Sequence, residues 1–386
     1  MLRTLVRSSL ALLAVPSLVS GQGQVFKTSL HDYRIVTVAD GLVNPWSMAW
    51  LPNGDMLVTE RPGRLRLVRA GKLVETPVDG VPKVAARGQG GLLDVVLHPN
   101  FASNRMVYLS YSKPMADTGT ATTTAVGRGR LEGNALVGFT DIFVAETKGT
   151  TGHFGSRLAF DAAGFLFVTV GDRMVPPAGN LEAHPAQDLS NHHGKVIRLH
   201  DDGRVPSDNP FVGRSGARGE IWSYGHRNMQ ALLVHPSTGE LWLTEHGPQG
   251  GDELNLIKKG ANYGWPVIGF GVNYGSGSAI HSGTRRDGME NAVHVWVPSI
   301  GVSGMTYYGG DKFPEWKGNV FAGGMSGELL ARFTVNGPQA EMAEVVVRRQ
   351  GRIRDVRQGP DGYLYLAIED RGGKPTSVVR LEPVRR

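Results

Sequence analysis

Hydrophobic residues in this chain occur in short runs that come in pairs, each pair joined by a glycine-containing turn. Six segments have this pattern, which predicts a strand, a tight turn and a second strand. Runs such as "MLVTE", "FLFVTV" and "LWLTE" are apolar nearly throughout, as expected for strands buried on both faces. The segments are MAWLPNGDMLVTE (48–60), VVLHPNFASNRMVYLSY (95–111), LAFDAAGFLFVTVGD (158–172), LLVHPSTGELWLTEH (232–246), MTYYGGDKFPEWKGNVFAGG (305–324) and VRQGPDGYLYLAIED (356–370).

The six segments begin roughly 50–75 residues apart, a period typical of propeller blades with insertions. We therefore predict an all-β fold, a six-bladed β-propeller with four-stranded blades, rather than a β-sandwich or two separate domains. The segment YRIVTVADGL (33–42) would be an unpaired edge strand on its own. We expect it to close the ring by pairing with the last blade, near residues 376–383.

The N-terminal residues 1–21 have the layout of a secretory signal peptide. Arg3 and Arg7 precede the apolar stretch SSLALLAVPSLVS, which is too short to span a bilayer, and Val19-Ser20-Gly21 offers small residues for cleavage. No other stretch is apolar enough for a membrane helix. We expect a single catalytic propeller over residues 22–386, secreted or periplasmic, with no membrane span.

The composition narrows the possible chemistry. The 386 residues include 53 glycines, 22 prolines and no cysteine, which excludes disulfides and cysteine-ligated zinc. The formal net charge is +6, but lysines and arginines form no dense run. This argues against nucleic acid as a partner and leaves room for a small anionic ligand. We assign three conspicuous tryptophans to blade packing rather than to a sugar platform: Trp265, Trp296 and Trp316.

Several polar residues lie next to the repeated segments, where propeller loops converge at one mouth of the central channel. Taken singly, each has an ordinary alternative: His153 as a hydrogen-bonded structural residue, Asp172 as a turn cap, and the pair Arg352 and Arg354 as a salt-bridged edge. Their joint placement favours one site. The candidates are Gln89, His153, Asp172, Arg227, Asn228, Gly247, Pro248, Arg352 and Arg354.

The segment TEHGPQGGDEL (244–254) ends a run of β-formers at Gly247-Pro248 and then places Asp252 beside Glu253. Two interpretations stay open on these residues alone, a polar turn and an oxygen-lined cation site. A Gly-Pro break stops the strand ladder, so carbonyl groups can turn outward, and calcium accepts backbone carbonyl oxygens.

Long blocks of the chain resemble the glucose/sorbosone dehydrogenase family, and in particular its soluble aldose sugar dehydrogenases, which use pyrroloquinoline quinone (PQQ). The resemblance runs from about residue 33 to the C-terminus. It is carried by NPWSMAWLPNGDMLVTERPGRLRLV, GQGGLLDVVLHPNF, EIWSYGHRNMQALLVHPSTGELW, EHGPQGGDELNLIKKGANYGWP and RIRDV.

The resemblance implies a PQQ- and calcium-dependent oxidation of aldose sugars at C1 to the lactone. Hydride passes to PQQ, and electrons leave to an external acceptor such as a quinone, a dye or a cytochrome. It further implies that His153 is the general base, that Asp172 orients it, and that Arg227 stabilises the oxyanion forming at the quinone C5. Arg352 and Arg354 would hold PQQ carboxylates through their planar donor forks.

The remaining roles also come from the resemblance. Gln89 and Asn228 match further cofactor contacts, as does Arg227. The carbonyls of Gly247 and Pro248 match the ligands of the calcium that bridges to PQQ. Glu253 and the backbone oxygen of Tyr263 match a second, structural calcium site, for which an ordinary surface acid is the alternative.

Two departures from the family pattern limit this transfer. Met229 replaces a proline, and GGMSGE (323–328) stands where glucose dehydrogenases present a lysine to PQQ. Two other functions compete. A calcium-dependent lactonase-type hydrolase would cage its metal with side-chain carboxylates and amides, and a non-catalytic propeller would only bind.

Overall fold

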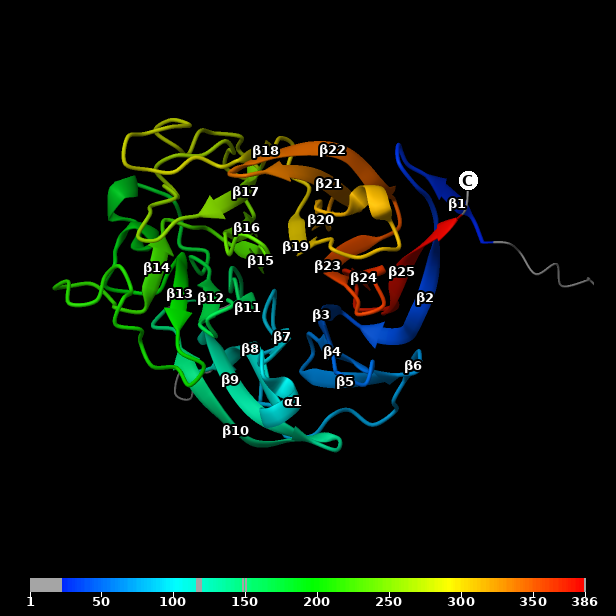
Figure 1. The fold of residues 1–386 in the computed structure, drawn as a ribbon. Helices are drawn as coiled ribbons and strands as arrows, with labels where there is room; N and C mark the ends of the chain where they lie inside the picture. The colour runs from blue at the N-terminus through cyan, green and yellow to red at the C-terminus, as the bar shows by residue number, and fades with distance from the viewer. Residues whose placement is uncertain (1–22, 116–119, 148, 150, 385–386) are drawn as a thin grey trace, which may run out of the picture.

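The computed structural model describes residues 23–115, 120–147, 149 and 151–384, so the expected signal peptide lies outside the described residues. Strands dominate this part of the chain, and they form six antiparallel sheets arranged around a ring (Figure 1). The predicted six-bladed β-propeller is confirmed. Short helical turns occur only between strands in the described ranges: α1 (Phe101–Asn104), η1 (Leu181–Ala183), η2 (Pro185–Gln187) and η3 (Pro314–Trp316).

Five sheets have four strands, in sequence order from one edge to the other. The strands of the first three are β3 (Pro45–Trp50), β4 (Met56–Glu60), β5 (Arg64–Arg69) and β6 (Lys72–Leu73); β7 (Leu92–Leu97), β8 (Met106–Pro114), β9 (Thr122–Glu132) and β10 (Ala135–Val144); and β11 (Leu158–Phe160), β12 (Leu166–Val170), β13 (Lys195–Leu199) and β14 (Ile221–Tyr224). The next two contain β15 (Met229–Val234), β16 (Leu241–Glu245), β17 (Asp252–Ile257) and β18 (His294–Trp296), then β19 (Val302–Tyr307), β20 (Val320–Gly324), β21 (Leu329–Asn336) and β22 (Gln339–Arg348).

The sixth sheet closes the ring. It combines the C-terminal strands β23 (Arg352–Gln358), β24 (Leu364–Glu369) and β25 (Pro375–Val384) with the N-terminal strand β2 (Asp32–Val43). Tyr33 pairs with Pro383 and Leu42 with Thr376, so the predicted closure is confirmed. One detail differs from the prediction of four strands per blade. The short strand β1 (Val25–Lys27) pairs with the outer side of β2 and makes this sheet five-stranded.

The repeated segments correspond to the inner hairpin of each blade. Each begins on one of the strands β3, β7, β11, β15, β19 and β23, which contact one another around the ring axis. The second strands β4, β12 and β16 are buried at every residue, as their apolar sequences predicted. The third and fourth strands of each blade lie outside the repeated segments, and fourth strands such as β10 and β22 are the more exposed.

Hydrophobic side chains fill the spaces between neighbouring blades. Tyr33, Val356 and Trp316 share one buried cluster, in which Trp316 stacks on Phe313 at 4.3 Å between ring centroids. Trp296 lies in another cluster and contacts Phe333 edge to face. The assignment of Trp296 and Trp316 to blade packing is confirmed.

Candidate active site

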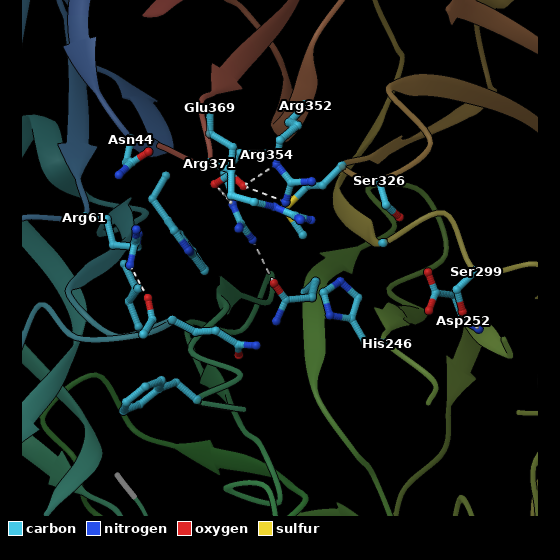
Figure 2. A pocket seen from close by; sticks show the side chains of 18 of the residues that line it. Asn44, Arg61, His246, Asp252, Ser299, Ser326, Arg352, Arg354, Glu369 and Arg371 are labelled. Carbon is cyan, nitrogen blue, oxygen red and sulfur yellow. Dashed lines mark hydrogen bonds and ion pairs between the residues drawn. The ribbon is translucent and has the colours of Figure 1, made fainter. Parts of the chain in front are cut away.

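The candidate site residues lie at one mouth of the ring because of how the inner hairpins are built. In an antiparallel hairpin, the residues before the first strand and after the second strand meet at the same end. Gln89, His153 and Arg227 precede inner strands, whereas Asp172 and Gly247 follow second strands. A cavity of about 390 Å³ opens at this end, and four predicted residues line it: Gln89, Gly247, Arg352 and Arg354 (Figure 2).

Arg352 and Arg354 lie on the same face of β23 and both pair with Glu369. Glu369 Oε1 is 3.0 Å from Arg352 Nη2, and its Oε2 is 2.8 Å from Arg354 Nε. Burial would raise the pKa of Glu369, but the charges and hydrogen bonds of the two arginines outweigh it and hold this pKa below its usual range. The two guanidinium groups are therefore fixed at the cavity wall by one shared carboxylate.

Two further arginines at the cavity were missed in the sequence. Arg61 follows β4 and Arg371 follows β24, and both line the cavity. Arg61 Nη1 donates to the carbonyl of Gly88, next to Gln89. Burial lowers the pKa of Arg61, and the charge of Arg354, which lines the same cavity, lowers it further. The cavity lining combines these four arginines with three acids, Asp252, Glu369 and Asp370, and the remaining positive charge favours an anionic ligand.

His153 and Asp172 form a buried pair beside this cavity. His153 Nδ1 lies 2.6 Å from Asp172 Oδ1, and both residues are less than a tenth exposed. Burial lowers the pKa of His153 below its ordinary value, although the Asp172 charge opposes this shift. Burial would raise the pKa of Asp172, but the charge and hydrogen bond of His153 and the charge of Arg227 outweigh it. The pair therefore holds a neutral imidazole against a carboxylate near neutral pH.

Backbone strain is concentrated around this pair. His153, Ser156, Arg173 and Met174 have positive φ angles of 47°, 77°, 60° and 61°, a region that side-chain-bearing residues rarely adopt. Arg173 holds one of these turns by donating from Nη1 to the carbonyl of Gly152. Such conformations cost free energy and persist where the surroundings enforce them, which is common at functional sites.

The two predicted amide contacts differ in position. Gln89 lines the cavity, and its Oε1 accepts the backbone N–H of His153 at 2.9 Å, so it links the cavity to the imidazole. Asn228 is buried, and its Oδ1 accepts from Gln230 Nε2 at 3.1 Å. Gln230 in turn accepts from Arg354 Nη1 at 3.0 Å. Asn228 is therefore linked to Arg354 at the cavity through hydrogen bonds of Gln230.

Arg227 connects the strand start to the Gly-Pro break. Its Nη1 donates to the carbonyl of Gly247 at 2.6 Å, and its backbone N–H donates to Glu245 at 2.7 Å. The carbonyl of Pro248 accepts from the hydroxyl of Tyr274 at 3.0 Å. Both carbonyls thus accept hydrogen bonds from side chains instead of from the backbone of a neighbouring strand. They line a smaller adjoining cavity of about 20 Å³, which Arg227 also lines.

Glu253 and Tyr263 line that same smaller cavity. Asn255 Nδ2 donates at 3.0 Å to both Glu253 and Glu245, so two carboxylates share one amide. Burial, followed by the charge of Glu245, raises the pKa of Glu253 to about 8. Two buried carboxyl groups therefore crowd this site, and burial next to Glu245 disfavours the charged form of Glu253. The interpretation of Glu253 as an ordinary surface acid does not fit these contacts.

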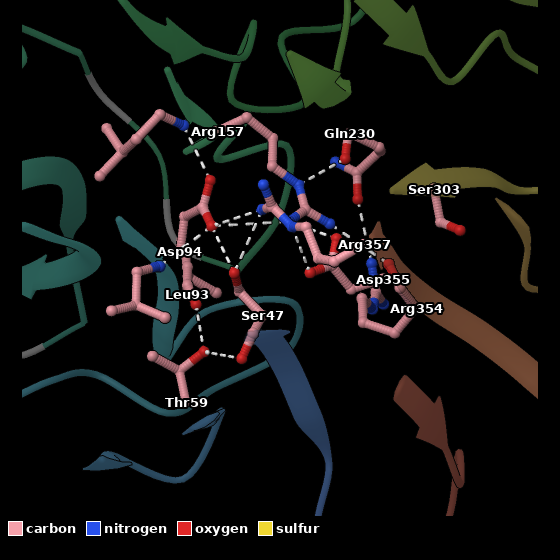
Figure 3. A network of polar contacts seen from close by, with 12 residues as sticks. Ser47, Thr59, Leu93, Asp94, Arg157, Gln230, Ser303, Arg354, Asp355 and Arg357 are labelled. Carbon is pink, nitrogen blue, oxygen red and sulfur yellow. Dashed lines mark hydrogen bonds and ion pairs between the residues drawn. The ribbon is translucent and has the colours of Figure 1, made fainter. Parts of the chain in front are cut away.

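A largely buried polar network lies further along β23, around Asp355 and Arg357 (Figure 3). Arg157 Nη1 is 2.9 Å from Asp355, and Arg357 Nη2 is 3.1 Å from Asp94. Arg157 also donates to the backbone oxygen of Arg354 at 3.2 Å. Two arginines and two aspartates from three blades balance in charge, and they anchor the strand that carries the cavity arginines.

The fold and this mouth are those of a propeller enzyme, with an arginine-lined cavity beside a buried imidazole–carboxylate pair. No helix in the described residues is both long and apolar enough to cross a membrane. Residues 42–380 match the family model for Glucose / Sorbosone dehydrogenase. The chain belongs to this family and is an oxidoreductase.

Individual relatives agree with the family model. The chain is 46% identical to the aldose sugar dehydrogenase YliI of Escherichia coli (strain K12), over 88% of this chain and 91% of that protein. A solved structure of the soluble aldose sugar dehydrogenase from Escherichia coli in the apo-form is similar at TM-score 0.85 and 43% identity, covering 91% of this chain and all of that chain. The PQQ-bound aldose sugar dehydrogenase from Streptomyces coelicolor is similar at TM-score 0.73 and 29% identity, covering 91% and 98%.

Proposed function

We propose that this oxidoreductase oxidises aldose sugars at C1 to the lactone and depends on PQQ and calcium. The observation that carries the proposal is the arginine-lined cavity beside the buried His153–Asp172 pair. Substrate oxidation by hydride loss requires a base for the hydroxyl proton and an acceptor for the electrons. The chain supplies the base, and a cofactor has to supply the acceptor.

The cavity fits PQQ by charge. PQQ is a planar quinone with three carboxylates, and it supplies the two-electron acceptor when bound. Arg352 and Arg354 would hold carboxylates, with Arg61 and Arg371 at the same cavity. Gln89 would line the cavity beside these arginines, and Asn228 would hold Arg354 in place through Gln230. The family lysine is absent from 323–328, but Met325 and Ser326 of this segment line the cavity, so the arginines carry the anion binding.

The Gly-Pro break fits calcium by the chemistry of its donors. A carbonyl oxygen has two lone pairs, and the oxygens of Gly247 and Pro248 are each turned toward side chains rather than into a ladder. The Asp252 carboxylate accepts from the backbone N–H of Gly247 at 3.1 Å and adds negative charge nearby. These two oxygens would hold the calcium that contacts the cofactor.

The catalytic roles follow from the same contacts. His153 takes the proton of the anomeric hydroxyl on Nε2, because its Nδ1 faces Asp172. Asp172 orients the ring and stabilises its protonated form. Arg227 places a cation beside the Gly-Pro carbonyls and stabilises negative charge that develops during oxidation.

A second calcium would bind at Glu253 and the backbone oxygen of Tyr263. The crowded carboxylates Glu253 and Glu245 and the raised pKa of Glu253 support a cation there. The protein is further proposed to be exported after loss of residues 1–21, to act as one catalytic propeller over 22–386, and to pass electrons to an external quinone, dye or cytochrome.

The competing lactonase-type hydrolase has less support. It requires a metal held by side-chain carboxylates and amides, and the described part of the chain contains no group of three or more His, Cys, Asp or Glu side chains placed for a metal. One experiment separates the two functions. Adding PQQ and calcium to cofactor-free protein should produce a quinone absorbance band that an aldose bleaches. Lactone hydrolysis without PQQ would instead support the hydrolase.

A further inference from the structure

Trp265 does more than pack between blades, contrary to the expectation from its sequence context. It lies in the long connection between β17 and β18 and is 7% exposed. Its indole Nε1 donates to Asp172 Oδ2 at 2.8 Å. The other oxygen of the same carboxylate, Oδ1, faces His153 Nδ1. The indole therefore binds Asp172 Oδ2, the carboxylate oxygen that the imidazole does not contact.

The face of the same indole supports Arg227. The guanidinium carbon of Arg227 lies 5.1 Å from the ring centroid, within the range of a cation–π contact. One rigid side chain thus contacts both the partner of the proposed base and the proposed electrostatic group. These two residues come from different blades, Asp172 after β12 and Arg227 before β15.

The backbone of Trp265 is itself held firmly. Its N–H donates to the carbonyl of Gly225 at 2.8 Å, and its carbonyl accepts from Gln187 Nε2 at 2.7 Å. The rings of His184 and His281 contact the indole edge to face, at 6.2 and 5.6 Å between centroids. The position of the indole N–H is therefore set before any ligand binds.

We propose that Trp265 is a positioning residue for the catalytic pair, an inference that rests on the proposed function. With both carboxylate oxygens occupied, Asp172 cannot rotate about its terminal bond. The fixed carboxylate keeps the proton of neutral His153 on Nδ1 and leaves Nε2 as the proton acceptor. The ring face keeps Arg227 at a constant distance from that pair. Two further titratable or charged groups interact with His153: Arg173, from the turn after β12, and His246, which follows β16.

The test is Trp265→Phe, which keeps an aromatic face for Arg227 and removes only the N–H donor. Trp296→Phe is the matched control, because Trp296 is 6% exposed and its indole nitrogen has no hydrogen-bond partner among the described residues. The first readout is the ¹⁵N spectrum of histidine-labelled, cofactor-free protein at pH 7.5. In the wild type and in Trp296→Phe, His153 should show one tautomer with Nδ1 protonated. In Trp265→Phe, both ring nitrogens should shift toward a tautomer average.

The second readout is single-turnover reduction of bound PQQ by an aldose. Trp265→Phe should bind PQQ with unchanged affinity and reduce it between about 10-fold and 10²-fold more slowly, the scale of a small misplacement of catalytic groups. A wild-type tautomer signal for His153 in Trp265→Phe would overturn the proposal. Protein that binds no PQQ would instead refute the proposed function, and the tautomer measurement would still decide the role of Trp265.

A reciprocal measurement covers the case in which Trp265→Phe does not fold. In Asp172→Ala, the indole N–H resonance of Trp265 should move upfield and exchange faster with D₂O than in the wild type. An unchanged resonance and exchange rate would show that the indole donates elsewhere and would also overturn the proposal.

Discussion

His153 Nδ1 lies 2.6 Å from Asp172 Oδ1, across the gap between the loop before β11 and the turn after β12. Both residues belong to the same blade, so the hairpin β11–β12 fixes their separation. A short contact between a buried imidazole and a buried carboxylate determines which ring nitrogen carries the proton. On the proposed function, a proton on Nδ1 would leave Nε2 as the ring nitrogen that accepts the substrate proton.

Replacing His153 with alanine should slow sugar-dependent reduction of bound PQQ by roughly 10²-fold or more, the usual range for losing a positioned base. PQQ and calcium should still bind. Because burial lowers the pKa of His153, the wild-type rate should rise with pH, reach half its maximum below the ordinary histidine value of about 6.5, and then stay level. Single-turnover absorbance measurements across pH would show this rise of the rate, and the rise should be absent in His153→Ala.

Asp172→Asn provides the comparison for this variant. It keeps the base in place but removes the charge that stabilises its protonated form, so the loss should be smaller than in His153→Ala. A wild-type reduction rate in His153→Ala would assign the proton transfer to another group at the mouth.

Replacing either Arg352 or Arg354 with alanine should weaken PQQ binding by about 1.5–3 kcal/mol, the scale of a charged hydrogen bond. Each variant also leaves Glu369 with one cation fewer, which lowers the affinity for an anion further. Titration of cofactor-free protein with PQQ measures the effect. Arg380→Ala is the control, since Arg380 pairs with Glu382 on the same sheet away from the cavity. Equal affinities in all three variants would place the PQQ carboxylates elsewhere.

Chelation should remove activity, because on the proposed function the carbonyls of Gly247 and Pro248 would hold a calcium ion that the cofactor needs. After EDTA treatment and removal of the cofactor, calcium together with PQQ should restore sugar oxidation, whereas either alone should not. A dye-reduction assay with an aldose is sufficient. Full activity of the stripped protein would exclude both cofactors.

Glu253→Gln should abolish the gain in thermal stability that calcium gives the cofactor-free protein. A ligand that binds only the folded state stabilises it by about 2.7 kcal/mol at a hundred times its dissociation constant. The variant should also be more stable than the wild type in EDTA, because one of two crowded carboxylates is gone. Melting curves with and without calcium measure both effects, and Glu240→Gln on the surface of the same blade is the control. An undiminished calcium response in Glu253→Gln would rule out this ligand.

Asp94→Asn should lower the free energy of unfolding by about 3–5 kcal/mol, the cost of breaking a buried ion pair by removing one partner. It leaves Asp355 as the remaining aspartate for two arginines, the buried Arg157 and the partly buried Arg357. Asp202→Asn breaks an exposed pair with Arg204 and should cost about 0–1 kcal/mol. Urea titrations of both variants compare the two losses, and equal losses would show that the network is not stabilising.

Much of the fold could be predicted from the sequence because the inner hairpins repeat. The ring closure could be predicted because strand 33–42 needed a partner. The approach of Arg352 and Arg354 to one cavity followed from their two-residue spacing. Glu369 was missed, although counting outward from the turn of the last hairpin pairs it with Arg352 in the ladder.

Other site residues could not be placed without coordinates. The contact of Trp265 with Asp172 joins two blades through a long connection, and no local pattern fixes where the indole N–H points. Arg61 and Arg371 had a usable signal, since each directly follows a second strand, as Asp172 does. Whether such a residue faces the cavity or solvent depends on the turn that follows it.

The charged layer behind the cavity arginines affects how sugar and electron acceptor can reach the site. Asp94, Arg157 and Asp355 are each at most 1% exposed, so solvent does not reach the charged layer behind the cavity arginines. On the proposed function, a cofactor held by Arg352 and Arg354 would lie against this layer, and both sugar and electron acceptor would have to reach it from the mouth of the cavity. Sugar and electron acceptor would then react one after the other at the same mouth. Steady-state kinetics should therefore show parallel double-reciprocal lines, and excess sugar should inhibit by blocking the acceptor.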